Sequence, residues 1–206
     1  IAIEAYSGTA FNYANVNVTT GAVGTVTGGL VVSTPVLVNG MCRFSVTMTT
    51  AATGVPKFTA IICAADATYT FTGDGTSGVY LYGAQLNLGP LQPYYPTTSA
   101  AYYGPRFTYD PVTHAALGLL IEEQRTNLLK YSEQFDNAAW SKAAATVTAN
   151  AGAAPDGTTS ADLIVPNAAS AVHYVQQAPT LANSTIYTWS VYAKASGYSI
   201  IAIEAY

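Results

Sequence analysis

The sequence predicts an all-β protein, an antiparallel β-sandwich built from many short strands. Runs of β-branched and aromatic residues are separated by Gly, Asn, Asp and Thr turns at the spacing expected of a sandwich. Within these runs polar and apolar residues alternate, as in strands that bury one face. Half of the 206 residues are hydrophobic, which is enough to bury a core without disulfides or metals.

Four segments show the alternation most clearly, and each assigns one set of side chains to the core. These sets are Val16 and Val18; Cys42, Phe44, Val46 and Met48; Val79 and Leu81; and Tyr187, Trp189 and Val191. The side chains between them, including Tyr80, Tyr82 and Tyr192, are predicted to face away from the core. Asp74 and Gly75 supply the turn that precedes the third segment.

Residues 116–136 are the exception, because their apolar residues recur near the helical spacing. By periodicity alone they predict an amphipathic helix. The apolar residues are Leu117, Leu120, Ile121, Leu128, Tyr131 and Phe135. Gly118 and the β-branched Thr126 weaken the prediction without removing it.

Charge is scarce. Charged residues make up 9% of the chain, against roughly 25% in ordinary soluble domains, so hydroxyls and amides must supply most of the polar surface. The seven Lys and Arg residues are scattered singly and the net charge is −4. We therefore expect no nucleic-acid partner. No apolar run approaches the roughly 18 residues of a spanning helix, so we expect no membrane insertion.

Cys42 and Cys63 lie in two of the predicted strands. They could face each other across neighbouring strands, or they could be two separate buried thiols. Two cysteines in a chain of this size do not make a disulfide framework, so we favour buried thiols.

No catalytic group can be assembled from the sequence. Glu122 and Glu123 are adjacent, so in an extended chain they point to opposite faces and cannot act together on one bond. His114 and His173 are the only histidines, and neither has a zinc-type spacing around it. Each is predicted to lie on the surface or in a loop. We therefore predict that the protein is not an enzyme and has no cofactor.

Three acidic residues could supply oxygen ligands to a calcium ion, namely Glu133, Asp136 and Asp156. They lie in the turn-like sequences YSEQFDN and APDGTTSAD, where aspartates commonly cap turns through their own side chains. We favour turn capping and predict no metal site, with calcium as the alternative.

Residues 118–140, GLLIEEQRTNLLKYSEQFDNAAW, resemble the leading segment of a family of carbohydrate-binding-module-like domains of bacteriophage virion proteins, described as head-fibre or tail-associated. The segments TVTANAGAAPDGTTSADLI, YTWSVYAKA and SGVYLYGAQLNLG with PYYPTTSA resemble its later signatures, so the similarity covers nearly the whole chain. The resemblance implies a jelly-roll sandwich with glycan-facing aromatic residues on one sheet and no catalysis. It also implies that residues 119–136 are mostly extended. Asn87 stands where such domains have an acidic residue, which puts a calcium ligand there in doubt.

These motifs stand in permuted order, because the closing signature at 77–99 precedes the opening one at 106–140. Placing residues 119–206 before residues 1–100 restores the family order. We therefore predict that residues 1–100 form the C-terminal half of such a sandwich and residues 119–206 the N-terminal half, with 101–118 as a connecting segment.

The same rearrangement overlaps two copies of the hexapeptide IAIEAY, at residues 1–6 and 201–206. We interpret the offset as a true repeat, one strand counted twice. Alternation predicts that its isoleucines face the core and its tyrosine faces outward. The residues of this assembly strand are Ile1, Ile3 and Tyr6, with Ile201, Ile203 and Tyr206 as their equivalents.

Three explanations fit the duplicated hexapeptide: a circular permutant, a processed natural chain, or a window on a longer protein of tandem near-identical domains, which we favour. Only one copy can fill a given place in a sheet, so one completes its own domain and the other completes the next. We expect residues 201–206 to pair with a strand of a neighbouring copy, which gives a head-to-tail filament.

Two functions follow. The first is a non-catalytic structural repeat unit of an extracellular or virion fibre, with identical copies as partners. The second is a glycan-binding module for adhesion to a receptor or host surface, in which aromatic faces stack on sugar rings. The candidate glycan contacts are Tyr80, Tyr82, Tyr192, Tyr206 and, in a loop, Trp140. Ordinary cross-strand packing is the alternative role for each tyrosine.

Overall fold

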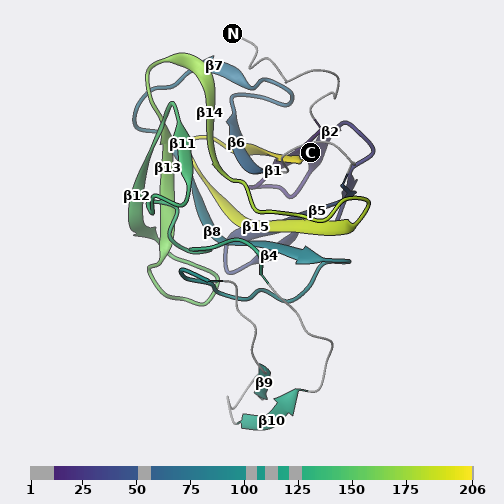
Figure 1. Ribbon diagram of the computed structural model, residues 1–206. Helices are drawn as coiled ribbons and strands as arrows, with labels where there is room; N and C mark the ends of the chain where they lie inside the picture. Colours follow the sequence, from purple (N-terminus) through teal and green to yellow (C-terminus); the bar gives the residue numbers. More distant parts are fainter. Residues whose placement is uncertain (1–11, 51–56, 101–105, 110–115, 121–126, 206) are drawn as a thin grey trace.

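The computed structural model describes residues 12–50, 57–100, 106–109, 116–120 and 127–205. In this part of the chain all regular elements are strands, and most of them form two seven-stranded sheets that pack as a β-sandwich (Figure 1). All strand pairs of both sheets are antiparallel. The fold class predicted from alternation is confirmed.

The two sheets draw strands from both ends of the sequence. In spatial order, the first sheet consists of β11 (Ser141–Ala143), β14 (Ser170–Gln177), β6 (Phe58–Cys63), β16 (Ile200–Ala205), β1 (Asn12–Asn17) and β2 (Val23–Val26), with β7 (Thr70–Thr72) beside β14. The second consists of β12 (Ala145–Gly152), β13 (Ala161–Pro166), β8 (Gly78–Leu88), β15 (Ile186–Ser196), β5 (Met41–Thr49) and β3 (Val31–Val32), with β4 (Val36–Val38) beside β5. Described strands between residues 12 and 88 and between residues 141 and 205 therefore build one sandwich together.

A small separate pair of strands lies where we predicted a connecting segment. β9 (Arg106–Tyr109) and β10 (Ala116–Leu120) are antiparallel and, among the described residues, pair only with each other. Figure 1 places this pair outside the sandwich.

The segment from residue 127 to residue 140 consists of turns, and together with β10 it shows that the helix expected from periodicity is wrong for the described residues. Asn127 explains how these turns are held. Its side-chain amide donates to the carbonyls of Ala84 and Tyr95, and its side-chain oxygen accepts from the amides of Leu86 and Leu129. The apolar spacing that imitates a helix arises because successive turns direct Phe135 into the core and pack Leu128 and Tyr131 against it.

The core between the sheets contains every described side chain that the alternation assigned to it, Trp189 included. The alternation changes phase once, within β8. Gly83 has a φ of 62° and forms a bulge opposite β15, so that both Leu81 and Ala84 face the core. Beyond the bulge Gln85 faces the outer side.

β16 carries the C-terminal copy of the repeated hexapeptide and lies in the interior of the first sheet, between β1 and β6. Ile201 and Ile203 are fully buried in the core, as predicted. Both edges of β16 are paired within its own chain, with β1 and β6, and the expected pairing of residues 201–206 with a neighbouring copy stays a prediction. Ile1, Ile3, Tyr6 and Tyr206 lie outside the described residues.

The two cysteines are free and buried in different places. Cys42 lies on β5 in the main core, whereas Cys63 lies on β6 and faces the outer side of the first sheet. They cannot face each other across neighbouring strands, because β5 and β6 belong to different sheets. Burial raises the pKa of both thiols, that of Cys63 to about 12.

We predict that neither thiol reacts with Ellman's reagent in the native protein at pH 8, because each is buried and protonated. Both should react at once when denaturant unfolds the chain, and non-reducing electrophoresis should show no internal crosslink. Reaction of one thiol in the native state would contradict the burial of that cysteine.

Candidate functional site

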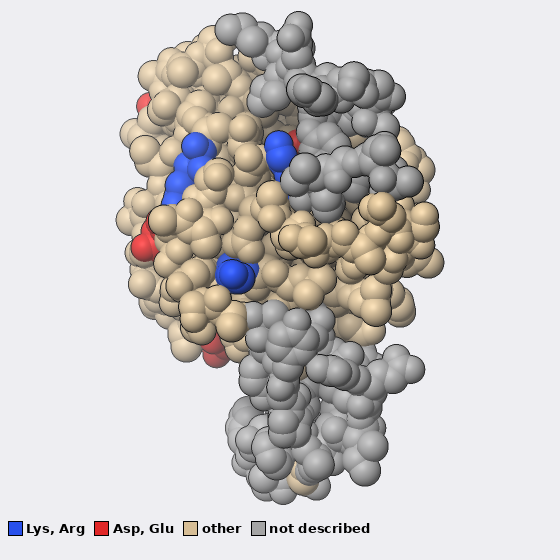
Figure 2. Space-filling model, viewed as in Figure 1, with Lys and Arg blue, Asp and Glu red and all other residues tan. Residues whose placement is uncertain are grey.

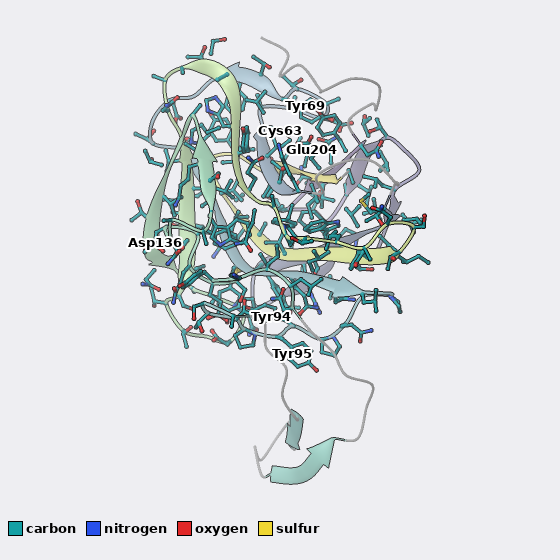
Figure 3. All side chains as sticks on the ribbon, viewed as in Figure 1. Cys63, Tyr69, Tyr94, Tyr95, Asp136 and Glu204 are labelled. Atoms are coloured by element: carbon teal, nitrogen blue, oxygen red, sulfur yellow. The ribbon has the colours of Figure 1, made fainter. Side chains whose placement is uncertain are left out.

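The outer face of the second sheet carries a group of aromatic side chains, here called the tyrosine cluster and defined as Tyr80, Tyr82, Tyr94 and Tyr192. The ring centroids of Tyr82, Tyr94 and Tyr192 lie 5.7–6.1 Å apart. Tyr82 on β8 and Tyr192 on β15 are directly paired across the strands, and Tyr80 packs beside them. Figure 3 shows Tyr94 on the opposite side of the sandwich from Cys63.

Two glycines make room for these rings. A Cβ atom on Gly83 would lie 3.1 Å from ring atoms of both Tyr94 and Tyr192, which is tighter than ordinary packing. A Cβ atom on Gly152 would lie 2.7 Å from the ring of Tyr80. The cluster therefore depends on a close approach of the backbone, which only glycine allows.

Glu133 accepts hydrogen bonds from two of the tyrosines. The hydroxyls of Tyr82 and Tyr94 donate to its Oε1 atom at 2.8 and 2.9 Å. Burial raises the pKa of both hydroxyls, and the Glu133 carboxylate raises it further. Both tyrosines are therefore protonated donors at neutral pH, and each donates a hydrogen bond to the Glu133 carboxylate.

A second carboxylate reaches the same point. Oδ2 of Asp156 lies 3.3 Å from the Tyr82 hydroxyl. Its other oxygen accepts from the amide and the hydroxyl of Thr158. Burial alone would raise the pKa of Asp156, but hydrogen bonds from Thr158 and Tyr82 outweigh it, and the net pKa is lowered. The Thr158 bonds confirm the turn-capping interpretation for Asp156.

The three calcium candidates are not brought together as a set. Glu133 and Asp156 meet at Tyr82, whereas Asp136 is exposed and its backbone carbonyl accepts from Lys142. Across the described residues, no group of three or more His, Cys, Asp or Glu side chains could hold a metal ion.

Arg43 places a positive charge beside the tyrosine cluster. Its guanidinium lies 5.2 Å from the centre of the Tyr192 ring, a cation–π contact. One of its nitrogens also donates to the carbonyl of Gln92 at 2.7 Å. This bond ties β5 to the segment that follows β8 and brings Tyr94 over the sheet.

Asn87 helps to hold that segment in place. Its side-chain amide donates to the carbonyls of Leu88 and Pro90 at 3.0 and 2.7 Å. A carboxylate cannot donate, so the acidic residue of the resembling family could not make these bonds. The asparagine at position 87 thus has a structural role that an acidic residue could not fill.

The five candidate glycan contacts have different environments in the structure. Tyr80 and Tyr192 are half-buried on the outer face, where they were expected. Tyr82 faces outward as predicted but is only 6% exposed, because Tyr94 and Tyr192 cover it. Tyr206 lies outside the described residues.

Trp140 was wrongly expected to present its ring to solvent. It is 1% exposed and packs in the main core with its ring centroid 4.7 Å from that of Phe135. Its indole nitrogen donates to the carbonyl of Tyr131, which satisfies the polar end in the interior. Tyr94 was not among the predicted contacts, and its only signal in the sequence is the motif PYYP, which lies a few residues after the end of β8.

His173 is also placed differently from the expectation of a surface or loop residue. It is fully buried on β14, and its two ring nitrogens lie 2.7 and 2.9 Å from the carbonyl oxygens of Ala144 and Phe71. It therefore connects three segments of the sandwich. His114, Glu122 and Glu123 lie outside the described residues.

Most of the described charged residues are at least partly exposed, whereas Asp162 and Glu204 are buried. On the face drawn in Figure 2, single charged residues are separated by broad uncharged areas. In the ranges that the structure describes, no helix has the length and apolar character to cross a membrane.

We predict that Gly83→Ala lowers the free energy of unfolding by about 2–4 kcal/mol, from its positive φ and from overpacking against two tyrosine rings. Gly89→Ala is the matched control, because Gly89 has a φ of 71° and nothing within 4 Å of its would-be Cβ atom. That variant should lose only about 1–2 kcal/mol. Equal losses in urea titrations would show that the tyrosine rings do not crowd Gly83.

Comparison with protein-family models, with curated proteins and with solved structures gave no match to this chain. The similarity to phage carbohydrate-binding-module-like domains thus stays a prediction from the sequence motifs.

Proposed function

We propose that the protein is a non-catalytic structural repeat unit of an extracellular or virion fibre, a carbohydrate-binding-module-like β-sandwich that assembles head to tail with identical copies. One observation carries the proposal. The strand sequence IAIEAY occurs twice in the chain, whereas the sheet has one place for it, between β1 and β6.

A strand that fills the position of β16 must bury its inward side chains and pair with a neighbour on both edges. β16 buries Ile201 and Ile203 completely, and burying an isoleucine is worth about 1.5–3 kcal/mol. It also satisfies the backbone groups of two neighbouring strands. A second copy of the same sequence fits this place in another molecule equally well, and a strand passed from each copy to the next gives an assembly that does not close.

The edges of the sandwich support a role in association. Three of the most exposed apolar side chains lie on the short strands β3 and β4, with exposed fractions of 65% for Val31, 56% for Val36 and 57% for Leu37. Exposed apolar side chains grouped beside β5 suit contacts between subunits. Because the chain has few charged residues, electrostatic repulsion between identical copies is weak.

We expect the chain to form a concentration-dependent series of oligomers in analytical ultracentrifugation. A variant carrying Ile1→Ser and Ile3→Ser should remain monomeric with its fold intact, since the place in the sheet is filled by β16. Val36→Ser is the control, because it removes an exposed apolar side chain without touching the repeated strand. A parent chain that is monomeric at every concentration would refute head-to-tail assembly.

The tyrosine cluster favours a second candidate function, glycan binding for adhesion. Tyr80 and Tyr192 offer partly accessible rings, and Arg43, Glu133 and Asp156 surround them with groups that can bond sugar hydroxyls. A fibre can also be adhesive, so the two functions are compatible.

If this second function holds, the protein binds at least one glycan on an array, and Tyr192→Ala weakens that binding about tenfold or more through the loss of a stacking surface. Tyr174→Ala, which alters a half-buried tyrosine packed on the outer side of the other sheet, should leave it unchanged. Absence of binding in the parent, or equal binding by both variants, would remove this candidate.

A further inference from the structure

The register between β16 and β1 shows which residues would pair if residues 1–5 replaced residues 201–205. Ala205 lies opposite Asn12, and the pairing runs antiparallel to Ile201 opposite Val16. Residues 1–5 have the same sequence as residues 201–205. If Ala5 took the place of Ala205, it would stand opposite Asn12 in its own continuous chain, with residues 6–11 as a loop of six residues.

Such a loop is geometrically ordinary. A hairpin joins antiparallel strands, which is the direction that β16 and β1 already have. Connections of about 4–6 residues are the most common in compact domains. The loop begins YSG, and Ser7 and Gly8 are residues that favour turns. In sequence, residues 1–5 are thus the nearer candidate partner for β1, whereas β16 reaches β1 from residues 200–205.

The side chains fit equally well. Ile1 and Ile3 would enter the core where Ile201 and Ile203 now lie. Ala2 would stand where Ala202 is fully buried on the other face. The one difference is Ile200, which pairs with Cys63 and Asn17 and has no counterpart in residues 1–6.

We propose that residues 1–5 and β16 are interchangeable occupants of one place in the first sheet, and that filling it from the N-terminus releases β16 to the equivalent place in a second copy of this chain. This inference rests on the proposed fibre function for the fate of the released strand. The interchange itself is a property of the single chain. Each copy has two strands for one place, so one strand per copy is always available to a partner.

Three variants of the full chain test the interchange: Ile3→Asp, Ile203→Asp and the two together. An aspartate in the interior excludes that copy of the strand from the core. Each single variant should keep a cooperative thermal transition and the near-ultraviolet circular dichroism of the buried tryptophans, because the other copy fills the sheet. The double variant should lose both signals.

Rescue of the double variant by an added strand provides the second measurement. The synthetic peptide IAIEAY should restore the cooperative transition, whereas the same peptide with its second isoleucine replaced by aspartate should not. Restoration by neither peptide, with both single variants folded, would show that a tethered strand is needed and would overturn release to a partner.

The outcomes separate this inference from the fibre proposal. If Ile203→Asp unfolds the protein while Ile3→Asp does not, β16 is the sole occupant and the interchange is overturned. A folded double variant overturns it as well. If the single variants fold and the double variant does not, the interchange stands. An unmodified chain that sediments only as a monomer then refutes the fibre proposal alone.

Discussion

The rest of the structure depends on a filled strand position between β1 and β6. A strand in the interior of a sheet satisfies the backbone groups of two neighbours and contributes its inward side chains to the core, so an empty position would leave two open edges over a cavity. β16 fills it with Ile201 and Ile203, both fully buried. The sequence of residues 1–6 is identical to that of residues 201–206, so a second segment of the chain has the side chains that this position requires.

The second sheet is organised around the bulge at Gly83. By adding one residue to β8, the bulge allows Leu81 and Ala84 to face the core, while Tyr82 and Gln85 face outward on either side of it. The missing Cβ atom at the same position accommodates Tyr94, which arrives on the segment after β8. Gly83 therefore affects both the packing of the core and, together with Gly152, the arrangement of the tyrosine cluster.

The sequence motifs predicted the strands and their inward side chains well, and the environment of individual polar and aromatic residues poorly. Alternation placed Phe44, Trp189 and Ile203 in the core, where they lie. It could not show that Trp140 turns inward, because Trp140 lies in a turn, outside any alternating run. It placed Tyr82 on the outer face but could not show that another tyrosine, distant in sequence, covers it.

By itself the sequence determined the fold class, the inward faces of β1, β5, β15 and the first part of β8, and the equivalence of its two terminal hexapeptides. These properties are local, because strand alternation and sequence identity are read within a few residues. Only the tertiary structure decided that Cys42 and Cys63 belong to different sheets and that Glu133 and Asp156 meet at one tyrosine hydroxyl. It also decided that β16 completes the sheet of its own chain, antiparallel to β1. Each of these depends on which distant segments come together, and the pairing of distant strands is a property of the whole chain.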